Sequence, residues 1–202
     1  LTRFGKTNLV GKAFGIIKFV PDSATEEIDI SVPRIDSKST GKGHKDFEVK
    51  LGKGITLQQD QLRRDFWMNA MARDVETGEI HDIEGKGQTD IDNKQIRVIG
   101  IRAFREDPLR MLRAVQFAAR FEFTIEPKTM DQIKSSVNLI KTVSPERFQE
   151  EFKKMFEKGT PSVGVALLKE TGILKKLFPR ARDSFPMEYD KLDKKGFPAF
   201  LV

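Results

Sequence analysis

The stretch that decides the architecture is "REDPLRMLRAVQFAAR", residues 105–120. Two acids and a proline lead into apolar residues that are interrupted by arginines. On a helical wheel of about 100° per residue, one arc of roughly 120° is entirely apolar. It contains Met111, Leu112, Val115, Ala118 and Ala119. The spacing therefore predicts a helix over residues 106–121 that buries one face.

The opposite face of this helix is charged. It contains Glu106, Asp107, Arg110, Arg113 and Arg120, with Phe117 among them. Such a face is typical of a solvated surface with a weak intrahelical ion pair, because Asp107 and Arg110 are three residues apart. Two details favour a second interpretation, a covered face that binds a charged ligand. The cations are arginines in a chain rich in lysine, and a phenylalanine lies in their midst.

Asp107 and Arg110 also suit one particular ligand, the pairing edge of cytosine or adenine. Both bases present an exocyclic amino donor beside a ring-nitrogen acceptor. A carboxylate can accept from the amino group while a guanidinium donates to the ring nitrogen. Uracil and guanine have these positions reversed. The hypothesis is that the pair distinguishes C and A from U and G.

Composition limits the other kinds of site. The chain of 202 residues has no cysteine and only two histidines, His44 and His81, so a thiolate or histidine metal centre is not expected. Both histidines are interpreted as loop or strand residues without a catalytic part. A net charge of +6 fits a polyanionic partner. No apolar run is long enough for a bilayer span, so we expect a cytoplasmic protein without a membrane partner.

The chain changes character near residue 105. Before it, short apolar runs predict an antiparallel strand pair over 13–20 and 26–32, and a helix over 57–74. Further strands are predicted over 47–51 and 94–100, and further helices over 127–138, 145–157, 161–171 and 173–177. Pro108, Pro127, Pro145 and Pro161 each lie where a helix is expected to begin. The fold class is therefore α+β, with a sheet-containing head before an all-helical neck.

Several segments resemble one known family. Residues 105–127 are similar to the helix that follows the catalytic sheet in bacterial-type tRNA nucleotidyltransferases, the CCA-adding enzymes, and in the related bacterial poly(A) polymerases. The other similar segments are "FGKTNLVGKAFGIIKF" (4–19), "EIDISVPR" (27–34), "RRDFWMNAMARDVETGEIHDI" (63–83), "KQIRVIG" (94–100) and "SPERFQEEFKKM" (144–155). The resemblance implies a nucleotidyltransferase-type head with a mixed or antiparallel sheet.

The resemblance also implies a division of the chain. Residues 1–100 would be the later part of the head, and residues 101–180 a helical neck that recognises nucleotides. Residues 181–202 are an unassigned tail or the start of a further helical body. The first residue is Leu1 and not methionine, so we expect the chain to be a piece of a longer protein whose head begins upstream.

Roles for single residues follow from the resemblance. Asp107 and Arg110 would contact the base, and Arg113 the nucleotide. Arg64, Asp65 and Asn69 would position the triphosphate and sugar. Arg120 and Arg147 are candidate RNA contacts, and Arg147 could instead cap the neck helix.

The implied reaction is template-independent addition of CMP and AMP to the 3′ end of tRNA, with CTP and ATP as substrates and Mg²⁺ as cofactor. The family's metal ligands, a D-x-D pair, would lie upstream of Leu1, and Asp29 would be a catalytic carboxylate beside them. Alternatively, Glu27 and Asp29 are themselves the pair. Without the upstream strand we expect the chain alone to be inactive.

Two other functions stay open. A poly(A) polymerase would share every motif, and a catalytically silent RNA-binding relative would lack the metal ligands. The sequence does not indicate the oligomeric state.

Overall fold

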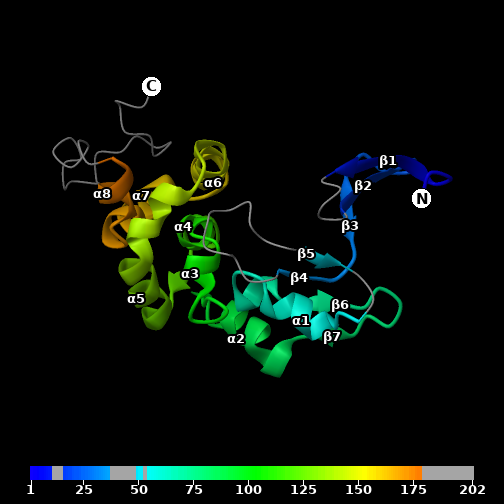
Figure 1. Ribbon diagram of the computed structural model, residues 1–202, viewed down its shortest axis with the longest axis horizontal. Helices are drawn as coiled ribbons and strands as arrows, with labels where there is room; N and C mark the ends of the chain where they lie inside the picture. The colour runs from blue at the N-terminus through cyan, green and yellow to red at the C-terminus, as the bar shows by residue number, and fades with distance from the viewer. Residues whose placement is uncertain (11–15, 37–48, 52–53, 179–202) are drawn as a thin grey trace. The chain divides into compact units, whose positions relative to one another are not determined.

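The computed structural model describes residues 1–10, 16–36, 49–51 and 54–178 (Figure 1). By its backbone contacts the chain divides into two units, Leu1–Arg63 and Arg64–Val202. His44 and the tail over 181–202 lie outside the described residues. The division falls well before the change in sequence character near residue 105, and the head–neck boundary at residue 100 stays a prediction.

A three-stranded antiparallel sheet opens the first unit. Its order is β1-β2-β3, made of β1 (Gly5–Val10), β2 (Ile16–Pro21) and β3 (Ile28–Ser31). Lys18 of β2 lies opposite Asp29 of β3. The predicted strand pair is thus confirmed as β2 and β3. The first strand was not predicted. It starts at Gly5, where a Cβ would lie 2.2 Å from the carbonyl oxygen of Val20.

The other elements described in the first unit are a short strand pair and a helix. Strand β4 (Arg34–Asp36) pairs antiparallel with β5 (Val49–Leu51), and α1 covers Leu57–Leu62. Thr56 and Gln59 cap α1 reciprocally, each side chain accepting from the other's backbone N–H at 3.2 Å and 2.9 Å.

The predicted helix over 57–74 was wrong in its length, because α1 ends at Leu62. Phe66, four residues later, has extended backbone angles and no exposed surface. Burial of the aromatic ring removes more apolar surface from water than another helical turn on the surface would, so tertiary packing overrides the local periodicity.

The second unit begins with short elements. They are η1 (Trp67–Asn69), the antiparallel hairpin β6 (Ala72–Arg73) and β7 (Ile80–His81), η2 (Ile83–Gly85), α2 (Lys86–Asp92) and β8 (Gln95–Ile96). The strand predicted over 94–100 is shorter than expected, although Val98 adds an isolated bridge to Phe66. Strand β8 pairs in parallel with β9 (Thr124–Ile125).

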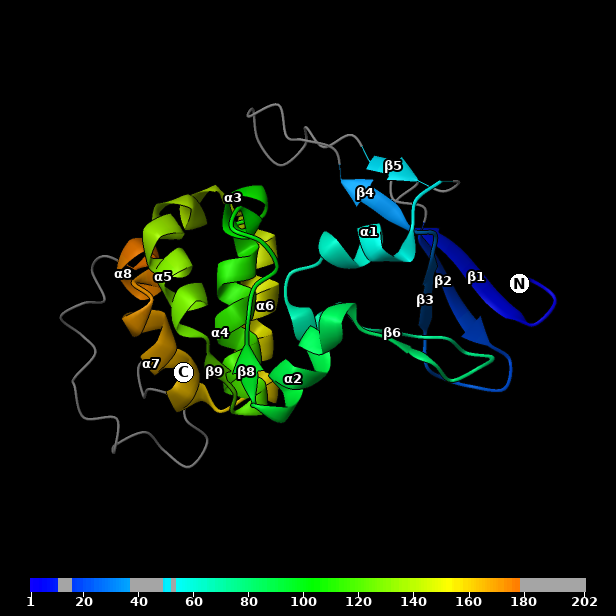
Figure 2. The same ribbon diagram turned by 90° about the horizontal axis from the view of Figure 1, so that it is seen from below.

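The remaining elements that the structure describes in the second unit, up to residue 178, are helices (Figure 2). They are α3 (Ala103–Glu106), α4 (Leu109–Phe121), α5 (Pro127–Ser136), η3 (Val137–Thr142), α6 (Pro145–Lys158), α7 (Pro161–Glu170) and α8 (Ile173–Leu177). Helices α5, α6 and α7 each begin at a proline, as the sequence predicted, since the first helical position needs no backbone N–H partner. None of the helices in the described ranges is long and apolar enough to cross a bilayer.

The helix predicted over 106–121 is broken at Asp107. This residue has φ −140° and ψ 99° and lies between α3 and α4. A residue that precedes proline is disfavoured in the helical region, and Pro108 follows it. The apolar face is confirmed, because all five of its residues have no exposed surface.

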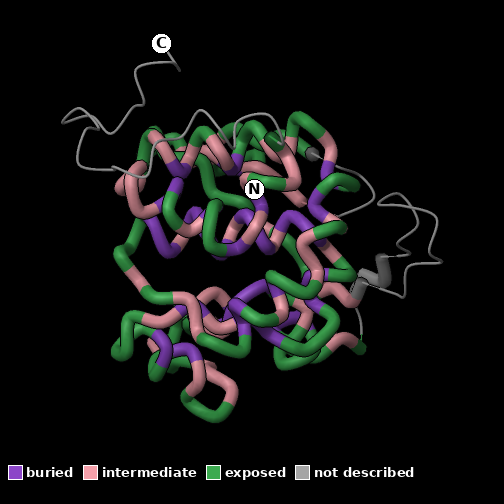
Figure 3. The backbone as a smooth tube through the Cα atoms, turned by 90° about the vertical axis from the view of Figure 1, so that its left-hand side faces the viewer, coloured by how far each residue is buried: buried purple, intermediate pink, exposed green. Residues whose placement is uncertain are grey.

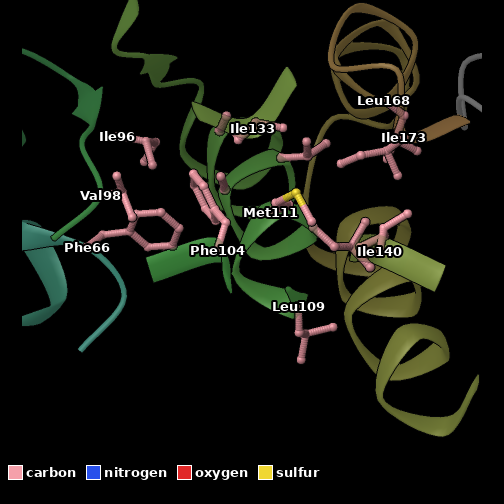
Figure 4. Close-up of a cluster of buried hydrophobic side chains, with 14 of the residues drawn as sticks. Phe66, Ile96, Val98, Phe104, Leu109, Met111, Ile133, Ile140, Leu168 and Ile173 are labelled. Carbon is pink, nitrogen blue, oxygen red and sulfur yellow. The ribbon is translucent and has the colours of Figure 1, made fainter. Parts of the chain in front are cut away.

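Helix α4 lies at the centre of the second unit's core. It packs against α6 and α7, and buried stretches of backbone alternate with exposed ones along the helices (Figure 3). Met111 projects from α4 into a cluster that includes Phe104, Ile140 and Ile173 (Figure 4). Helix α4 thus presents an apolar face to this core, while its charged face carries Arg110 and Arg113.

Replacement of Leu112 by alanine should destabilise the second unit strongly. The side chain is fully buried, so the change leaves a cavity that costs about 2–5 kcal/mol. Ile101→Ala is the matched control, because Ile101 is 85% exposed and should change stability by no more than about 0.5 kcal/mol. Urea unfolding followed by the fluorescence of Trp67, the single tryptophan, measures both. Equal losses of unfolding free energy in the two variants would contradict the burial of Leu112 in the core around α4.

Candidate functional site

The turn before η1 brings three of the sequence-predicted residues together. The Asp65 side chain is nearly buried, and its Oδ1 accepts hydrogen bonds from the Phe66 backbone N–H at 2.9 Å and from Asn69 Nδ2 at 3.1 Å. Arg64 Nη1 donates to the Asn69 carbonyl oxygen at 3.3 Å. Asp65 and Arg64 are therefore both tied by hydrogen bonds to the residues that follow them in the chain.

Arg113 of α4 connects this turn to α6. Its Nε and Nη2 donate to Asp65 Oδ2 at 2.8 Å and 2.7 Å, and its Nη1 lies 3.4 Å from Glu151 Oε1 on α6. Burial alone would lower the pKa of the Arg113 guanidinium, but the charge and hydrogen bonds of Asp65, followed by the charge of Glu151, raise it. Arg113 is a charged bridge between two carboxylates.

Aromatic rings cover one side of this bridge. The Arg113 guanidinium lies 5.0 Å from the centre of the Phe117 ring, which meets the Phe66 ring edge-on at 5.9 Å. A cation over a ring face is attracted by the ring quadrupole. The charged face of α4 is thus covered around Arg113, as the position of Phe117 in the sequence suggested.

Asp107 is paired with a different helix from the one that the sequence suggested. Arg147 of α6 donates from Nη2 to Asp107 Oδ2 at 2.8 Å and from Nη1 to Oδ1 at 3.2 Å. Arg110 Nη1 lies 3.7 Å from Glu106 Oε2. The predicted intrahelical pairing of Asp107 and Arg110 assumed one continuous helix, and the break before Pro108 removes that geometry.

The surroundings of Asp107 keep its carboxylate ionised. Burial acts to raise the pKa of Asp107, but the hydrogen bonds and charge of Arg147, the Leu109 backbone N–H and the charge of Arg110 together lower it. An ionised carboxylate only accepts hydrogen bonds. Asp107 is therefore a fixed acceptor at neutral pH, with the charge of Arg110 close enough to act on it.

Arg120 and Asp29 take no part in these ion pairs. Arg120 is exposed near the end of α4, with its guanidinium 5.0 Å from the Phe121 ring centre. Asp29, in the other unit, is exposed and lies 3.5 Å from Lys18 Nζ, and Lys18 also pairs with Glu27. Their roles in catalysis or RNA binding stay predictions.

The residues that the structure describes do not by themselves fit a Mg²⁺ site. Within these ranges no group of three or more acidic, histidine or cysteine side chains is placed to hold a metal ion. Glu27 and Asp29, the alternative metal pair, already face the Lys18 ammonium. We therefore assign no metal ligand among the described side chains.

Two features of α6 were not predicted from the sequence: a role for Glu151, and the pairing of Arg147 with Asp107. The available signal was the spacing in "SPERFQEE", because residues four apart in a helix share one face. Glu151 is only 4% exposed, and Lys154 Nζ also donates to its Oε1 at 2.8 Å. The four-residue spacing indicates that Glu151 lies on the same face of the helix as Arg147, and its burial in the structure shows that this face is covered.

Two family models match most of the chain. One is described as the poly(A) polymerase head domain and matches residues 2–97. The other is described as a probable RNA- and SrmB-binding site of polymerase A and matches residues 122–184. The chain belongs to the poly(A) polymerase and tRNA nucleotidyltransferase family. The resemblance seen in the sequence is thereby confirmed.

Curated members of the family are similar over most of this chain. The multifunctional CCA protein of Nitrosomonas europaea is 42% identical over 144 residues, which are 70% of this chain and 34% of that protein. That of Shewanella denitrificans is 37% identical over 182 residues, 87% of this chain and 42% of that protein. The chain thus spans about two fifths or less of the length of these relatives.

Solved structures of the family share the fold. The Bacillus stearothermophilus CCA-adding enzyme in complex with CTP matches with a TM-score of 0.73 and 32% identity, over 86% of this chain and 40% of that one. The Thermotoga maritima CCA-adding enzyme complexed with tRNA matches with a TM-score of 0.68 and 27% identity, over 87% and 38%. The expected α+β head and helical neck are confirmed.

The lowered pKa of Asp107 predicts a pH-dependent contribution to stability. Because the folded pKa lies below the ordinary value of 3.8, the ion pair stabilises the fold above that value and loses its effect as the pH falls through the folded pKa. Asp107→Asn should therefore be less stable than the wild type at neutral pH, and the two should converge in strong acid. Urea unfolding over a pH series measures this, and a difference that is independent of pH would contradict it.

Proposed function

We propose that this chain is the nucleotide-selecting part of a tRNA nucleotidyltransferase, which adds CMP and AMP to the 3′ end of tRNA without a nucleic-acid template. The curated relatives are named multifunctional CCA proteins, and one similar solved structure is a CCA-adding enzyme in complex with CTP. The observation that carries the proposal is the Asp107 carboxylate just before α4, which Arg147 and the Leu109 backbone N–H hold in place and on which the charge of Arg110 acts.

In this proposal a protein side-chain pair replaces the template base. Asp107 accepts a hydrogen bond from the exocyclic amino group of cytosine or adenine, and Arg110 donates to the neighbouring ring nitrogen. Uracil and guanine would present an acceptor to Asp107 and a donor to Arg110, and both contacts would be repulsive. Selection for C and A over U and G follows from this arrangement.

The other residues of the site bind the rest of the nucleotide. The Asp65–Arg113 pair and Asn69 form a rigid support for the sugar and phosphates, and Arg64 adds positive charge for the triphosphate. The RNA 3′-hydroxyl attacks the α-phosphate, and pyrophosphate leaves. Mg²⁺ remains the expected cofactor, and Asp29 stays the candidate catalytic carboxylate of this chain.

A poly(A) polymerase is the second candidate. The description of the matching head model favours it, since that model is named for poly(A) polymerase. Such an enzyme would use the same acceptor–donor pair for adenine alone. Both candidates act on RNA 3′ ends, and both agree with the cytoplasmic location expected from the sequence.

The nucleotide that is added separates these functions. The full-length protein should extend a tRNA transcript lacking its CCA end with CTP and then ATP, and it should incorporate UTP and GTP much more slowly. Primer-extension gels with single radiolabelled nucleotides measure this. Repeated addition of ATP alone to any RNA 3′ end would identify a poly(A) polymerase, and no addition at all would identify a catalytically silent RNA-binding relative.

Loss of either base-reading side chain should relax selection more than it weakens triphosphate binding. In the full-length protein, Asp107→Ala and Arg110→Ala should raise UTP and GTP incorporation relative to CTP and ATP by about tenfold or more, because one charge-assisted hydrogen bond is lost. Arg64→Ala is the contrast variant and should lower turnover with every nucleotide. Unchanged proportions of the four nucleotides in Asp107→Ala would refute the assignment.

A further inference from the structure

Two ion pairs of opposite polarity connect the nucleotide-reading residues to α6. Arg147 pairs with Asp107, and Glu151 pairs with Arg113. Arg147 and Glu151 are four residues apart on α6 and therefore lie on one face of that helix. Because the polarity alternates, α6 fits the charged residues next to it in only one register, and a shift along the helix would bring like charges together.

The geometry at Asp107 leaves room for one further hydrogen bond. An ionised carboxylate has about four acceptor positions on its two oxygens. Arg147 occupies one position on each oxygen, and the Leu109 backbone N–H donates to Oδ1 at 3.2 Å. The remaining position is on Oδ2. The carboxylate can therefore accept one more hydrogen bond, and the amino group of one nucleobase would supply it.

The fork of Arg147 also fixes the orientation of that remaining position. Two parallel N–H···O bonds from a planar guanidinium hold the carboxylate in the plane of the guanidinium, which a single ammonium cannot do. The backbone N–H of Leu109, two residues further along the chain, donates to the same carboxylate. Rotation of Asp107 would break several bonds together.

Glu151 plays the corresponding part for Arg113. Its Oε1 is near Arg113 Nη1 and accepts from Lys154 Nζ, whereas its buried Oε2 receives no hydrogen bond from the described residues. Arg113 directs Nε and Nη2 to Asp65 and Nη1 to Glu151, which keeps its five-donor fork from rotating. Arg147 and Glu151 of α6 thus hold two different residues of the proposed nucleotide site, Asp107 and Arg113.

We propose that Arg147 is a specificity-determining positioning residue, which orients Asp107 to accept one hydrogen bond from the base, and that Glu151 positions Arg113. This inference rests on the proposed function of the site. It differs from a role of Arg147 in RNA binding. A contact to RNA would affect the affinity for tRNA with every nucleotide, whereas positioning of Asp107 affects the choice among nucleotides.

The test compares Arg147→Lys with wild type in the full-length protein. Lysine keeps the charge and loses the fork, so the ratio of kcat/KM for CTP to that for UTP should fall about tenfold, the effect of one charge-assisted hydrogen bond. The dissociation constant for tRNA should not change. Lys153→Ala is the matched control, because Lys153 lies on α6, is 70% exposed and pairs only with Glu157 among the described residues. It should keep the wild-type ratio.

A double-mutant cycle shows whether Arg147 acts through Asp107. In an Asp107→Ala background, Arg147→Lys should change the nucleotide ratio no further, because the carboxylate that it orients is absent. Additive changes in the ratio would overturn the proposal. So would an unchanged ratio in the single variant, whether or not its affinity for tRNA falls.

Glu151→Gln is the second variant, which keeps the side-chain shape and tests the other half of the pair. It should lower kcat/KM for all nucleotides about equally, since Arg113 does not read the base, and a changed CTP-to-UTP ratio would overturn this assignment. If the wild-type protein adds neither CTP nor ATP to tRNA, the proposed function fails. If it adds both and Arg147→Lys keeps the ratio, only the positioning role fails.

Discussion

The ion pair between Asp65 and Arg113 is the interaction on which the rest of the site depends. Asp65 is 8% exposed, and an isolated charge at that depth would cost far more than a surface charge. Its two oxygens satisfy Arg113, the Asn69 amide and a backbone N–H together. The pair therefore fixes the turn before η1 against α4, and a change in either partner would leave the other buried without its counter-charge.

A single helix serves both the core and the site. The apolar face of α4 is fully buried, so packing constrains the axial rotation of the helix. Its opposite face then carries Arg110 and Arg113 toward the polar groups of neighbouring elements. Because the core decides the orientation, the site needs little additional energy to hold its arginines in place.

The sequence predicted those features that depend on near neighbours along the chain. Helix starts at proline and the buried face of α4 follow from local geometry, and both are confirmed. The partner of Asp107 is 40 residues away, and helical periodicity carries no information about it. The predicted end of the helix over 57–74 was wrong for the same reason. The burial of Phe66 depends on α4 and on the bridge to Val98. Motifs therefore identified the residues, and only tertiary structure supplied their pairing.

The break that sequence periodicity did not predict is what makes Asp107 accessible to α6. Inside a continuous helix, Asp107 would lie one turn from Arg110 and pair with it along the surface. Pro108 instead places Asp107 in extended backbone, where its carboxylate meets the Arg147 fork and the Leu109 N–H. Arg110 is then not needed to neutralise Asp107. In the proposed function, this separation is the condition for template-free reading, because acceptor and donor must each face the base and not each other.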